Sequence, residues 1–259
     1  MPEGHTVHRL ARCHREALAG RVVAVTSPQG RFADGGARLD GQKLDDVDAY
    51  GKDLAGWVGG LAWSGRRRGP RCPPRPRREV RHVHRRGASP ECGPMVCELL
   101  DPEGEGQILA WLGPDPLRDG RDAGPRFRQA LGRRSIPIGA ALLDQTVVAG
   151  IGNVSRAETL FLRGIHPDRP ARSLTDEEAA GLWSTIVEQL RLGERLGRIV
   201  TVDPAEVGAA RPEDLIDAGD ERLYVYRRAG LACRRCGTAL RGWKVGGRTI
   251  TACPTCQPR

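Results

Sequence analysis

Residues 142–154 read Leu142-Leu143-Asp144-Gln145-Thr146-Val147-Val148-Ala149-Gly150-Ile151-Gly152-Asn153-Val154. An apolar helix is expected to end before Gly150, because two glycines so close together free the backbone to turn. Asn153 is expected to open a second helix, which runs through Arg156 to Leu162. Backbone amides at a turn of this kind can hold a phosphate. The stretch therefore predicts two helices joined by a turn that binds an anion.

Four cysteines near the other end of the chain form two Cys-x-x-Cys knuckles. They are Cys233, Cys236, Cys253 and Cys256, with sixteen residues between the two pairs. Four thiolates at this spacing are typical of one tetrahedral zinc site, and the site is structural because no coordination position is left open. Disulfides are the alternative, but the chain shows neither a signal peptide nor a long apolar run. We therefore expect a reducing cytoplasm and one structural Zn²⁺.

The segment between the knuckles predicts a small β-hairpin. Residues 243–251 place a Gly246-Gly247 pair between two short runs that carry Trp, Val and Ile. Such runs around a Gly-Gly turn are typical of a two-stranded ribbon. Arg248 stands just past the turn, so we expect the ribbon to project its side chain outward.

The N-terminus carries a candidate nucleophile. The chain begins Met1-Pro2-Glu3-Gly4-His5-Thr6, and removal of Met1 would leave the secondary amine of Pro2 as the new terminus. An α-amino group titrates near pH ~8, so it attacks carbon more readily than a side-chain amine of pKa about 10. Glu3 beside it could move protons. Proline after the initiator is common, so this interpretation depends on the rest of the chain.

Four blocks in this order resemble one family. Besides the first six residues, residues 142–154 and the zinc ribbon, the chain contains Tyr50-Gly51-Lys52-Asp53-Leu54, similar to an Arg-Gly-Lys segment whose lysine follows a tight turn. Together they resemble the formamidopyrimidine-DNA glycosylase and endonuclease VIII family of base-excision repair enzymes. The resemblance implies a multidomain α+β fold. It would contain an N-terminal β-sandwich-like domain with a leading helix, a helical helix-two-turn-helix domain and a C-terminal zinc-ribbon β-hairpin.

The resemblance also assigns roles to single residues. Pro2 would form a Schiff base with C1′ of the damaged nucleotide, and Glu3 would protonate the opened sugar. Lys52 would protonate or stabilise leaving oxygens during β-elimination. Asn153 and Arg248 would bind phosphates beside the lesion, and Arg248 would also serve δ-elimination.

The implied activity is that of a bifunctional DNA glycosylase and apurinic/apyrimidinic lyase. Thr6 stands where many relatives have a glutamate, which points to an endonuclease VIII-like branch found in actinobacteria and so to oxidised pyrimidines. The partner would be damaged double-stranded DNA, with the target nucleotide out of the stack. We expect a monomer in the cytoplasm, associated with the nucleoid, with no membrane contact and no small-molecule cofactor.

Length and pattern predict two modest domains and the ribbon. We expect an N-terminal catalytic domain over 1–114, a linker over 115–126, the helix-two-turn-helix domain over 127–222 and the zinc finger over 223–259. A leading helix should end near Gly20 and carry one apolar face, formed by Val7, Leu10, Ala11, Ala17 and Leu18. A later helix should begin at the capping box Thr175-Asp176-Glu177-Glu178.

Residues 63–94 do not fit the domain that contains them. Ten arginines and only two glutamates lie there, so most of the net charge of +9 comes from this segment. Residues 66–78 contain no Leu, Ile, Phe or Tyr, and we do not expect them to form a strand with a buried face. We hypothesise a shifted reading frame, which would leave the domain two or so strands short. A real basic insertion that grips phosphates is the alternative.

This segment keeps a second function open. A frameshift present in the cell would put the activity itself in doubt. The alternative to the enzyme is then a catalytically impaired zinc-finger protein that binds damaged DNA without turnover.

Overall fold

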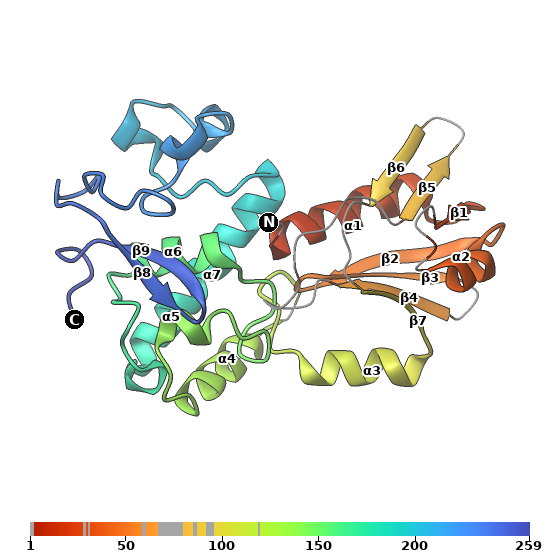
Figure 1. The fold of residues 1–259 in the computed structure, drawn as a ribbon, viewed down its shortest axis with the longest axis horizontal. Coiled ribbons are helices and arrows are strands. Elements are labelled where there is room, and N and C mark those ends of the chain that lie inside the picture. The colour runs from red at the N-terminus through yellow and green to blue at the C-terminus, as the bar shows by residue number, and fades with distance from the viewer. Residues whose placement is uncertain are drawn as a thin grey trace. The chain divides into compact units, whose positions relative to one another are not determined.

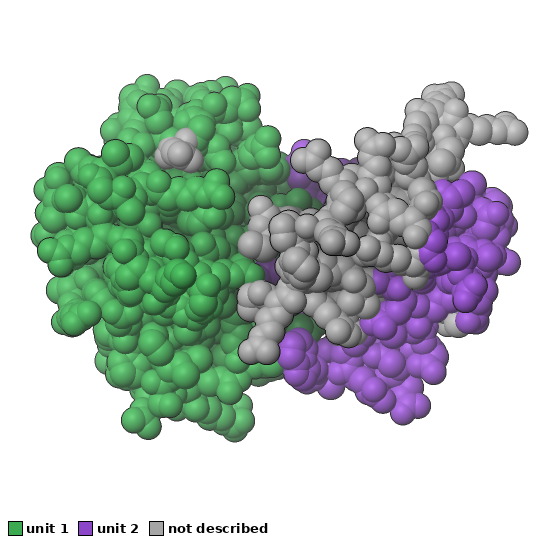
Figure 2. Space-filling view, viewed as in Figure 1, with its two compact units in different colours: residues 1–6, 112–259 green, residues 7–111 purple. Residues whose placement is uncertain are grey.

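The computed structural model describes residues 3–27, 30, 32–58, 61–66, 80–84, 87–91, 96–118 and 120–259. The chain divides into two compact units, coloured separately in Figure 2. We call Val7–Trp111 the sheet unit, and Met1–Thr6 together with Leu112–Arg259 the helical unit.

The sheet unit contains two antiparallel sheets (Figure 1). The larger has the strand order β2-β3-β4-β7, with β2 at Leu44–Tyr50, β3 at Asp53–Val58, β4 at Leu61–Arg66 and β7 at Val96–Leu100. The smaller has the order β1-β5-β6, with β1 at Ala24–Thr26, β5 at Val80–His84 and β6 at Gly87–Glu91. Two further helices are α2 (Ala33–Leu39) and α3 (Pro102–Trp111).

Most of α1 (Gly4–Leu18) also belongs to the sheet unit, and this helix confirms the predicted leading helix, although Ala17, predicted on its apolar face, is exposed. Its apolar face packs against β2 and β3 because Ala11 and Leu18 share one buried cluster with Val47 and Leu54. On its polar side, the Arg15 guanidinium pairs with two aspartates of β2. The chain turns at Gly20, whose φ of 77° favours glycine as predicted.

The 63–94 segment contains more regular structure than its composition predicts. Strand β4 ends within it, and β5 and β6 pair as an antiparallel hairpin. The expectation that the domain lacks about two strands here is therefore wrong. Its only valines, Val80 and Val83, both lie in β5, and valine favours strands. The most arginine-rich part, residues 67–79, lies outside the described residues.

The helical unit holds four α-helices and the C-terminal hairpin, all within its described residues. The helices are α4 (Ala123–Gly132), α5 (Ile138–Ala141), α6 (Asn153–Leu162) and α7 (Asp176–Leu196). Short 3₁₀ helices lie at Ala171–Ser173, Pro204–Val207, Pro212–Leu215 and Gly219–Arg222. The hairpin pairs β8 (Arg241–Val245) with β9 (Arg248–Ala252), around the predicted Gly246-Gly247 turn.

Residues 142–154 and the helix that begins within them fold partly as predicted. Helix α6 begins at Asn153 and ends at Leu162, as expected. The apolar helix before it is shorter than expected, because α5 ends at Ala141 and residues 142–149 form turns. The Asp144 carboxylate accepts from the backbone N–H and the hydroxyl of Thr146, which offers the backbone an alternative to continued helix.

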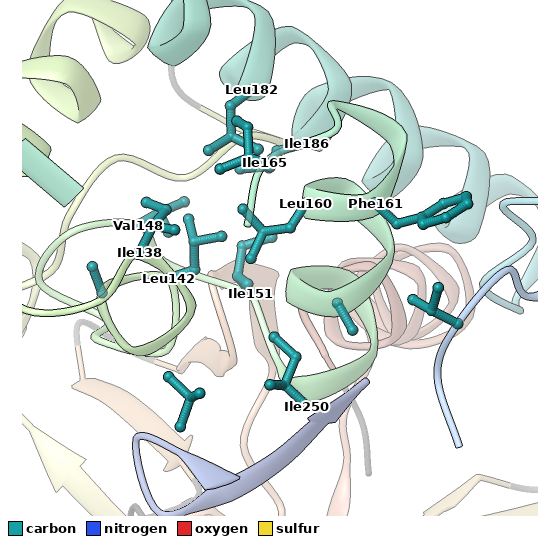
Figure 3. Packing of buried hydrophobic residues seen from close by; sticks show 14 of the residues in the cluster. Ile138, Leu142, Val148, Ile151, Leu160, Phe161, Ile165, Leu182, Ile186 and Ile250 are labelled. Carbon is teal, nitrogen blue, oxygen red and sulfur yellow. The ribbon is translucent and has the colours of Figure 1, made fainter. Parts of the chain in front are cut away.

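One hydrophobic core joins these helices to the hairpin (Figure 3). Ile138 of α5, Leu160 of α6 and Leu182 of α7 are fully buried in it. Ile250 of β9 reaches the same cluster, with only 1% of its surface exposed. The hairpin is thus packed on the helices and is not held by its turn alone.

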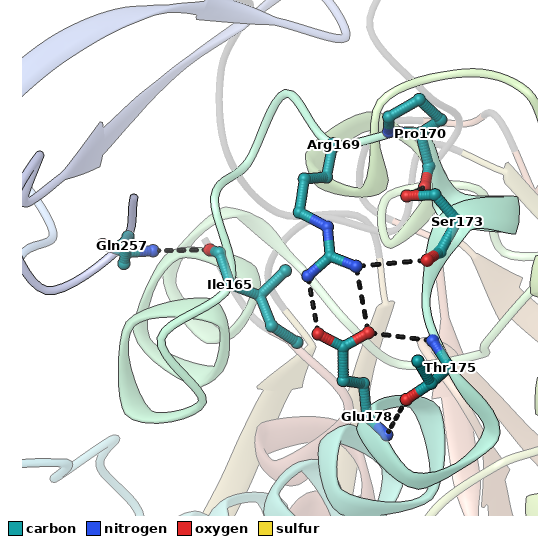
Figure 4. A network of polar contacts seen from close by, with 7 residues as sticks. All are labelled: Ile165, Arg169, Pro170, Ser173, Thr175, Glu178 and Gln257. Atoms are coloured by element: carbon teal, nitrogen blue, oxygen red, sulfur yellow. Dashed lines mark hydrogen bonds and ion pairs between the residues drawn. The ribbon is translucent and has the colours of Figure 1, made fainter. Parts of the chain in front are cut away.

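Helix α7 begins with the predicted capping box (Figure 4). The Thr175 hydroxyl accepts from the Glu178 N–H at 3.1 Å, and the Glu178 carboxylate accepts from the Thr175 N–H at 2.8 Å. Arg169 donates to both carboxylate oxygens of Glu178, at 2.6 and 2.9 Å. This bond lowers the pKa of Glu178 to about 2. No helix in the described part of the chain is both long and apolar enough to cross a membrane.

We expect Glu178→Gln to lower the free energy of unfolding by about 1 kcal/mol near neutral pH, since glutamine keeps the capping box but loses the Arg169 ion pair. The carboxylate stabilises fully above its unfolded pKa of about 4.3. This contribution is lost as pH falls through the folded pKa of about 2. Urea titrations should therefore show a difference from wild type that shrinks between about pH 5 and 2.

Glu177→Gln is the matched control because Glu177 is exposed in the same first turn. Equal losses in the two variants, or a pH-independent loss for Glu178→Gln, would contradict the prediction.

Candidate functional site

The carboxylate of Glu3 caps the N-terminus of α6. Glu3 is buried, with 2% of its surface exposed. Its two oxygens accept from three backbone N–H groups, those of Gly152 (3.0 Å), Val154 (2.9 Å) and Ser155 (3.3 Å). The first N–H groups of a helix have no partner within it, and its N-terminus carries partial positive charge. A carboxylate satisfies both requirements, so the position of Glu3 is fixed by α6.

Two glycines make room for this contact. A Cβ at Gly152 would lie 2.4 Å from the Glu3 carboxyl carbon, closer than atoms can approach. Gly150 has a φ of 95°, and its carbonyl accepts from the Gly4 N–H at 2.8 Å. The Gln145 side chain holds the same turn by accepting from the Gly150 N–H at 3.0 Å. The Gly150-Ile151-Gly152 turn therefore serves the close approach of the N-terminal segment.

Asn153 connects α6 to the hairpin. Its Nδ2 donates to the Thr249 carbonyl of β9 at 3.1 Å, and its Oδ1 accepts from Arg156 Nε at 2.9 Å. Arg248, the first residue of β9, follows the two turn glycines and is partly exposed. The predicted phosphate-binding pair, Asn153 and Arg248, thus belongs to one hydrogen-bonded assembly.

Arg156 is a further member of this assembly, which the sequence did not predict. It is fully buried, and its guanidinium donates to the carbonyls of Gly139, Val245 and Arg248 at 2.7, 3.0 and 3.1 Å. Burial, followed by the nearby charge of Arg248, lowers the pKa of Arg156 to about 10, so it stays protonated at neutral pH. Its spacing of three from Asn153 was the available signal, because such residues share a helix face.

Glu158, on the same helix, binds the loop over residues 224–226. It is fully buried and accepts from the backbone N–H groups of Tyr224 (2.8 Å), Val225 (2.9 Å) and Tyr226 (2.7 Å). The Thr201 hydroxyl also donates to it. One face of α6 therefore holds the hairpin, and another holds the loop that leads into the cysteine knuckles.

The four predicted cysteines come together. The Sγ atoms of Cys233, Cys236, Cys253 and Cys256 all lie within 4.8 Å of one another. Two of the pairs are 3.9 and 3.4 Å apart. A tetrahedral zinc with bonds of about 2.3 Å requires thiolates about 3.8 Å apart, so the arrangement fits this metal. The cluster could therefore bind one metal ion, and four protein ligands would leave no position open for chemistry.

Two further predicted site residues are Pro2 and Lys52. Pro2 lies outside the described residues. Lys52 lies in the sheet unit, directly after Gly51 in the turn that joins β2 to β3, and Gly51 has a φ of 58°. Lys52 is half-buried. The structure thus brings Glu3, Asn153 and Arg248 into one unit, and it shows Lys52 on the tight turn that the sequence predicted.

Comparisons with known proteins agree with this geometry. Residues 112–203 match the family model described as the formamidopyrimidine-DNA glycosylase H2TH domain. The chain is 42% identical over 274 residues to Endonuclease 8 1 of Mycobacterium bovis, an alignment that covers 99% of this chain and all of that protein.

Solved structures show the same fold. The crystal structure of the MutM (Fpg) protein from Thermus thermophilus is similar, with a TM-score of 0.76, 31% identity and coverage of 99% and 98% of the two chains. A complex between the Lactococcus lactis Fpg and abasic-site DNA is similar in fold, with a TM-score of 0.78, 23% identity and coverage of 99% and 100%. The predicted α+β fold class, with its helix-two-turn-helix and C-terminal cysteine module, is confirmed.

The close approach of Glu3 to Gly152 predicts a steric effect. We expect Gly152→Ala to destabilise the protein by about 1–3 kcal/mol, because the new methyl group would displace the Glu3 carboxylate. Thermal unfolding measures the change. Gly132→Ala is the control, since a Cβ at Gly132 of α4 meets nothing within 4 Å. A Gly152→Ala variant as stable as Gly132→Ala would show that Glu3 is not held as described.

The cysteine geometry predicts metal content. We expect about one zinc per folded chain, and we expect Cys236→Ser to lose it because three thiolates bind zinc less tightly. Atomic emission of purified protein measures both. Cys13→Ser should keep the metal, since Cys13 is an exposed cysteine of α1. Folded wild-type protein with much less than one zinc would refute the prediction.

Proposed function

The chain belongs to the formamidopyrimidine-DNA glycosylase and endonuclease VIII family, and from this we propose that it is a bifunctional DNA glycosylase and apurinic/apyrimidinic lyase of base-excision repair. One observation carries the proposal: the Glu3 carboxylate is fixed at the N-terminus of α6, in the unit that also holds Asn153 and Arg248. Peptide connectivity puts the Pro2 amine one residue from that carboxylate. The chain's candidate proton donor is thus preorganised beside its candidate nucleophile.

Pro2 performs the first step of the proposed mechanism. Its secondary amine attacks C1′ of the damaged nucleotide, the N–C1′ bond forms, and the base departs with the electrons of the glycosidic bond. The opened sugar then carries an iminium, which is permanently cationic because the proline nitrogen has no hydrogen left. This cation withdraws electrons from C2′ and so favours β-elimination.

Glu3 moves the protons of this step. The Glu3 carboxylate takes up the proton that the proline nitrogen releases after the attack and donates it to the ring oxygen as the ring opens, and the regenerated carboxylate then assists removal of the C2′ proton. The hydrogen bonds from Gly152 and Val154 fix both oxygens, so the group needs no reorganisation between the two roles. Lys52 stabilises the phosphate that leaves in β-elimination.

Asn153 and Arg248 act on the DNA backbone. The amide of Asn153 and the guanidinium of Arg248 donate to the phosphates beside the lesion, and Arg248 supports departure of the second phosphate in δ-elimination. One structural zinc in the cysteine cluster stabilises the module that carries Arg248. The enzyme requires no small-molecule cofactor.

The proposed substrate is an oxidised pyrimidine in double-stranded DNA. Thr6 is the residue that supports this choice, as it places the chain near the endonuclease VIII branch. The protein acts as a monomer on the nucleoid of the cytoplasm. The competing function, binding of damaged DNA without turnover, follows if residues 63–94 prevent catalysis.

Borohydride trapping tests the proposal. Protein mixed with an abasic-site duplex and the reductant should give a covalent adduct, since hydride reduces the iminium to a stable amine. The adduct should disappear in Pro2→Gly and in protein with an N-terminal extension. The same extension at the C-terminus is the control and should leave the adduct in place. Binding of the duplex by wild-type protein without an adduct would establish the non-catalytic function instead.

A further inference from the structure

Arg156 stands out among the charged residues of the helical unit because it is fully buried and its acceptors are neutral. Its guanidinium donates to the carbonyls of Gly139, Val245, Arg248 and Thr249 and to Asn153 Oδ1. Burying a cation without a carboxylate is costly unless its hydrogen bonds are nearly complete. The arrangement meets that condition, and every acceptor lies on α5, on α6 or on the hairpin.

The contacts bracket the hairpin turn. Val245 is the last residue before Gly246-Gly247, and Arg248 is the first residue after them. By donating to both carbonyls, at 3.0 and 3.1 Å, Arg156 fixes the two ends of the turn from which the Arg248 side chain extends. The turn also lies close to α5, since a Cβ at Gly246 would come within 3.2 Å of Ala140.

The contacts also orient Asn153. Because Arg156 can only donate, its bond identifies the acceptor as the oxygen of the Asn153 amide. The Nδ2 group then faces Thr249, and one of its two hydrogens is used there. The second hydrogen is available for a further acceptor. One buried guanidinium therefore fixes both the amide orientation of Asn153 and the backbone of Arg248.

We propose that Arg156 is a positioning residue that holds Asn153 and Arg248 at one spacing for neighbouring DNA phosphates. The role rests on the proposed function and refines it. Removal of the base depends on Pro2 and Glu3, whereas δ-elimination depends on the placement of Arg248. Loss of Arg156 therefore impairs the second cleavage more than the first.

The product ratio tests this role. A 5′-labelled duplex with one abasic site distinguishes β-elimination, which leaves an unsaturated sugar, from δ-elimination, which leaves a 3′-phosphate. In single turnovers of Arg156→Met, we expect the δ-to-β ratio to fall about tenfold or more, with borohydride trapping within about twofold of wild type. Arg156→Lys should change the ratio in the same direction, because one ammonium cannot reproduce the fork of the guanidinium.

Arg228→Met is the matched control. Arg228 is also buried in the helical unit and donates to the carbonyls of Tyr224 and Ala232, neither of which belongs to the hairpin strands. It should lose stability as Arg156→Met does and keep the wild-type product ratio. An equal fall in the ratio for both variants would reduce Arg156 to a structural role and overturn the proposal.

Salt dependence gives a second readout that needs no turnover. We expect Arg156→Met to reduce the slope of log Kd against log salt by about one, the same change that we expect for Arg248→Ala, although Arg248 itself is still present in Arg156→Met. An unchanged slope together with an unchanged product ratio would overturn the proposal. Wild-type protein that gives neither adduct nor β product would refute the proposed function alone, and the slope would still decide the role of Arg156.

Discussion

The arrangement of the helical unit depends on which group accepts hydrogen bonds from the first backbone N–H groups of α6. Its first N–H groups are buried, and each would cost about 1–3 kcal/mol without a partner. Glu3 supplies one carboxylate for three of them. The proposed proton-transfer group is therefore also a helix cap, and its position and the stability of the helix arise from the same bonds. Only glycine fits at position 152, because the Glu3 carboxylate lies too close to this residue to leave room for a Cβ.

Helix α6 then organises the rest of the helical unit through two further buried charges. Arg156 holds the hairpin and Glu158 holds the loop over 224–226. Other contacts join the cysteine module to the helices, such as the bond from Gln257 Nε2 to the Ile165 carbonyl at 2.8 Å (Figure 4). The stacking of Arg235 over the Phe161 ring at 4.9 Å adds another. The cysteine knuckles thus pack against the helical unit, and Arg248 is positioned by more than the cysteine cluster.

Much of this could be predicted where local chemistry is decisive. The capping box at Thr175, the Gly246-Gly247 turn and the start of α6 at Asn153 each follow from residues adjacent in sequence. The cysteine cluster followed from spacing alone. Long-range partners could not be predicted in this way. The spacing of three from Asn153 is the one nearby signal for Arg156, because its other acceptors are carbonyls of Gly139, Val245, Arg248 and Thr249, which are distant in sequence. The turns over 142–149 were missed for a related reason, since an apolar run reads as a helix until the Asp144 side chain is seen to cap a turn.

The hydrogen bond between Glu3 and Gly152 has a consequence for folding during translation. Glu3 leaves the ribosome long before Gly152, whose N–H donates to it, because Gly152 lies 149 positions later in the chain. The sheet unit, at Val7–Trp111, can be complete well before that. Glu3 must therefore remain without its partners until α6 has emerged, and the hairpin that α6 supports is made later still. The carboxylate proposed to move protons thus reaches its final position only after more than half of the chain has been made.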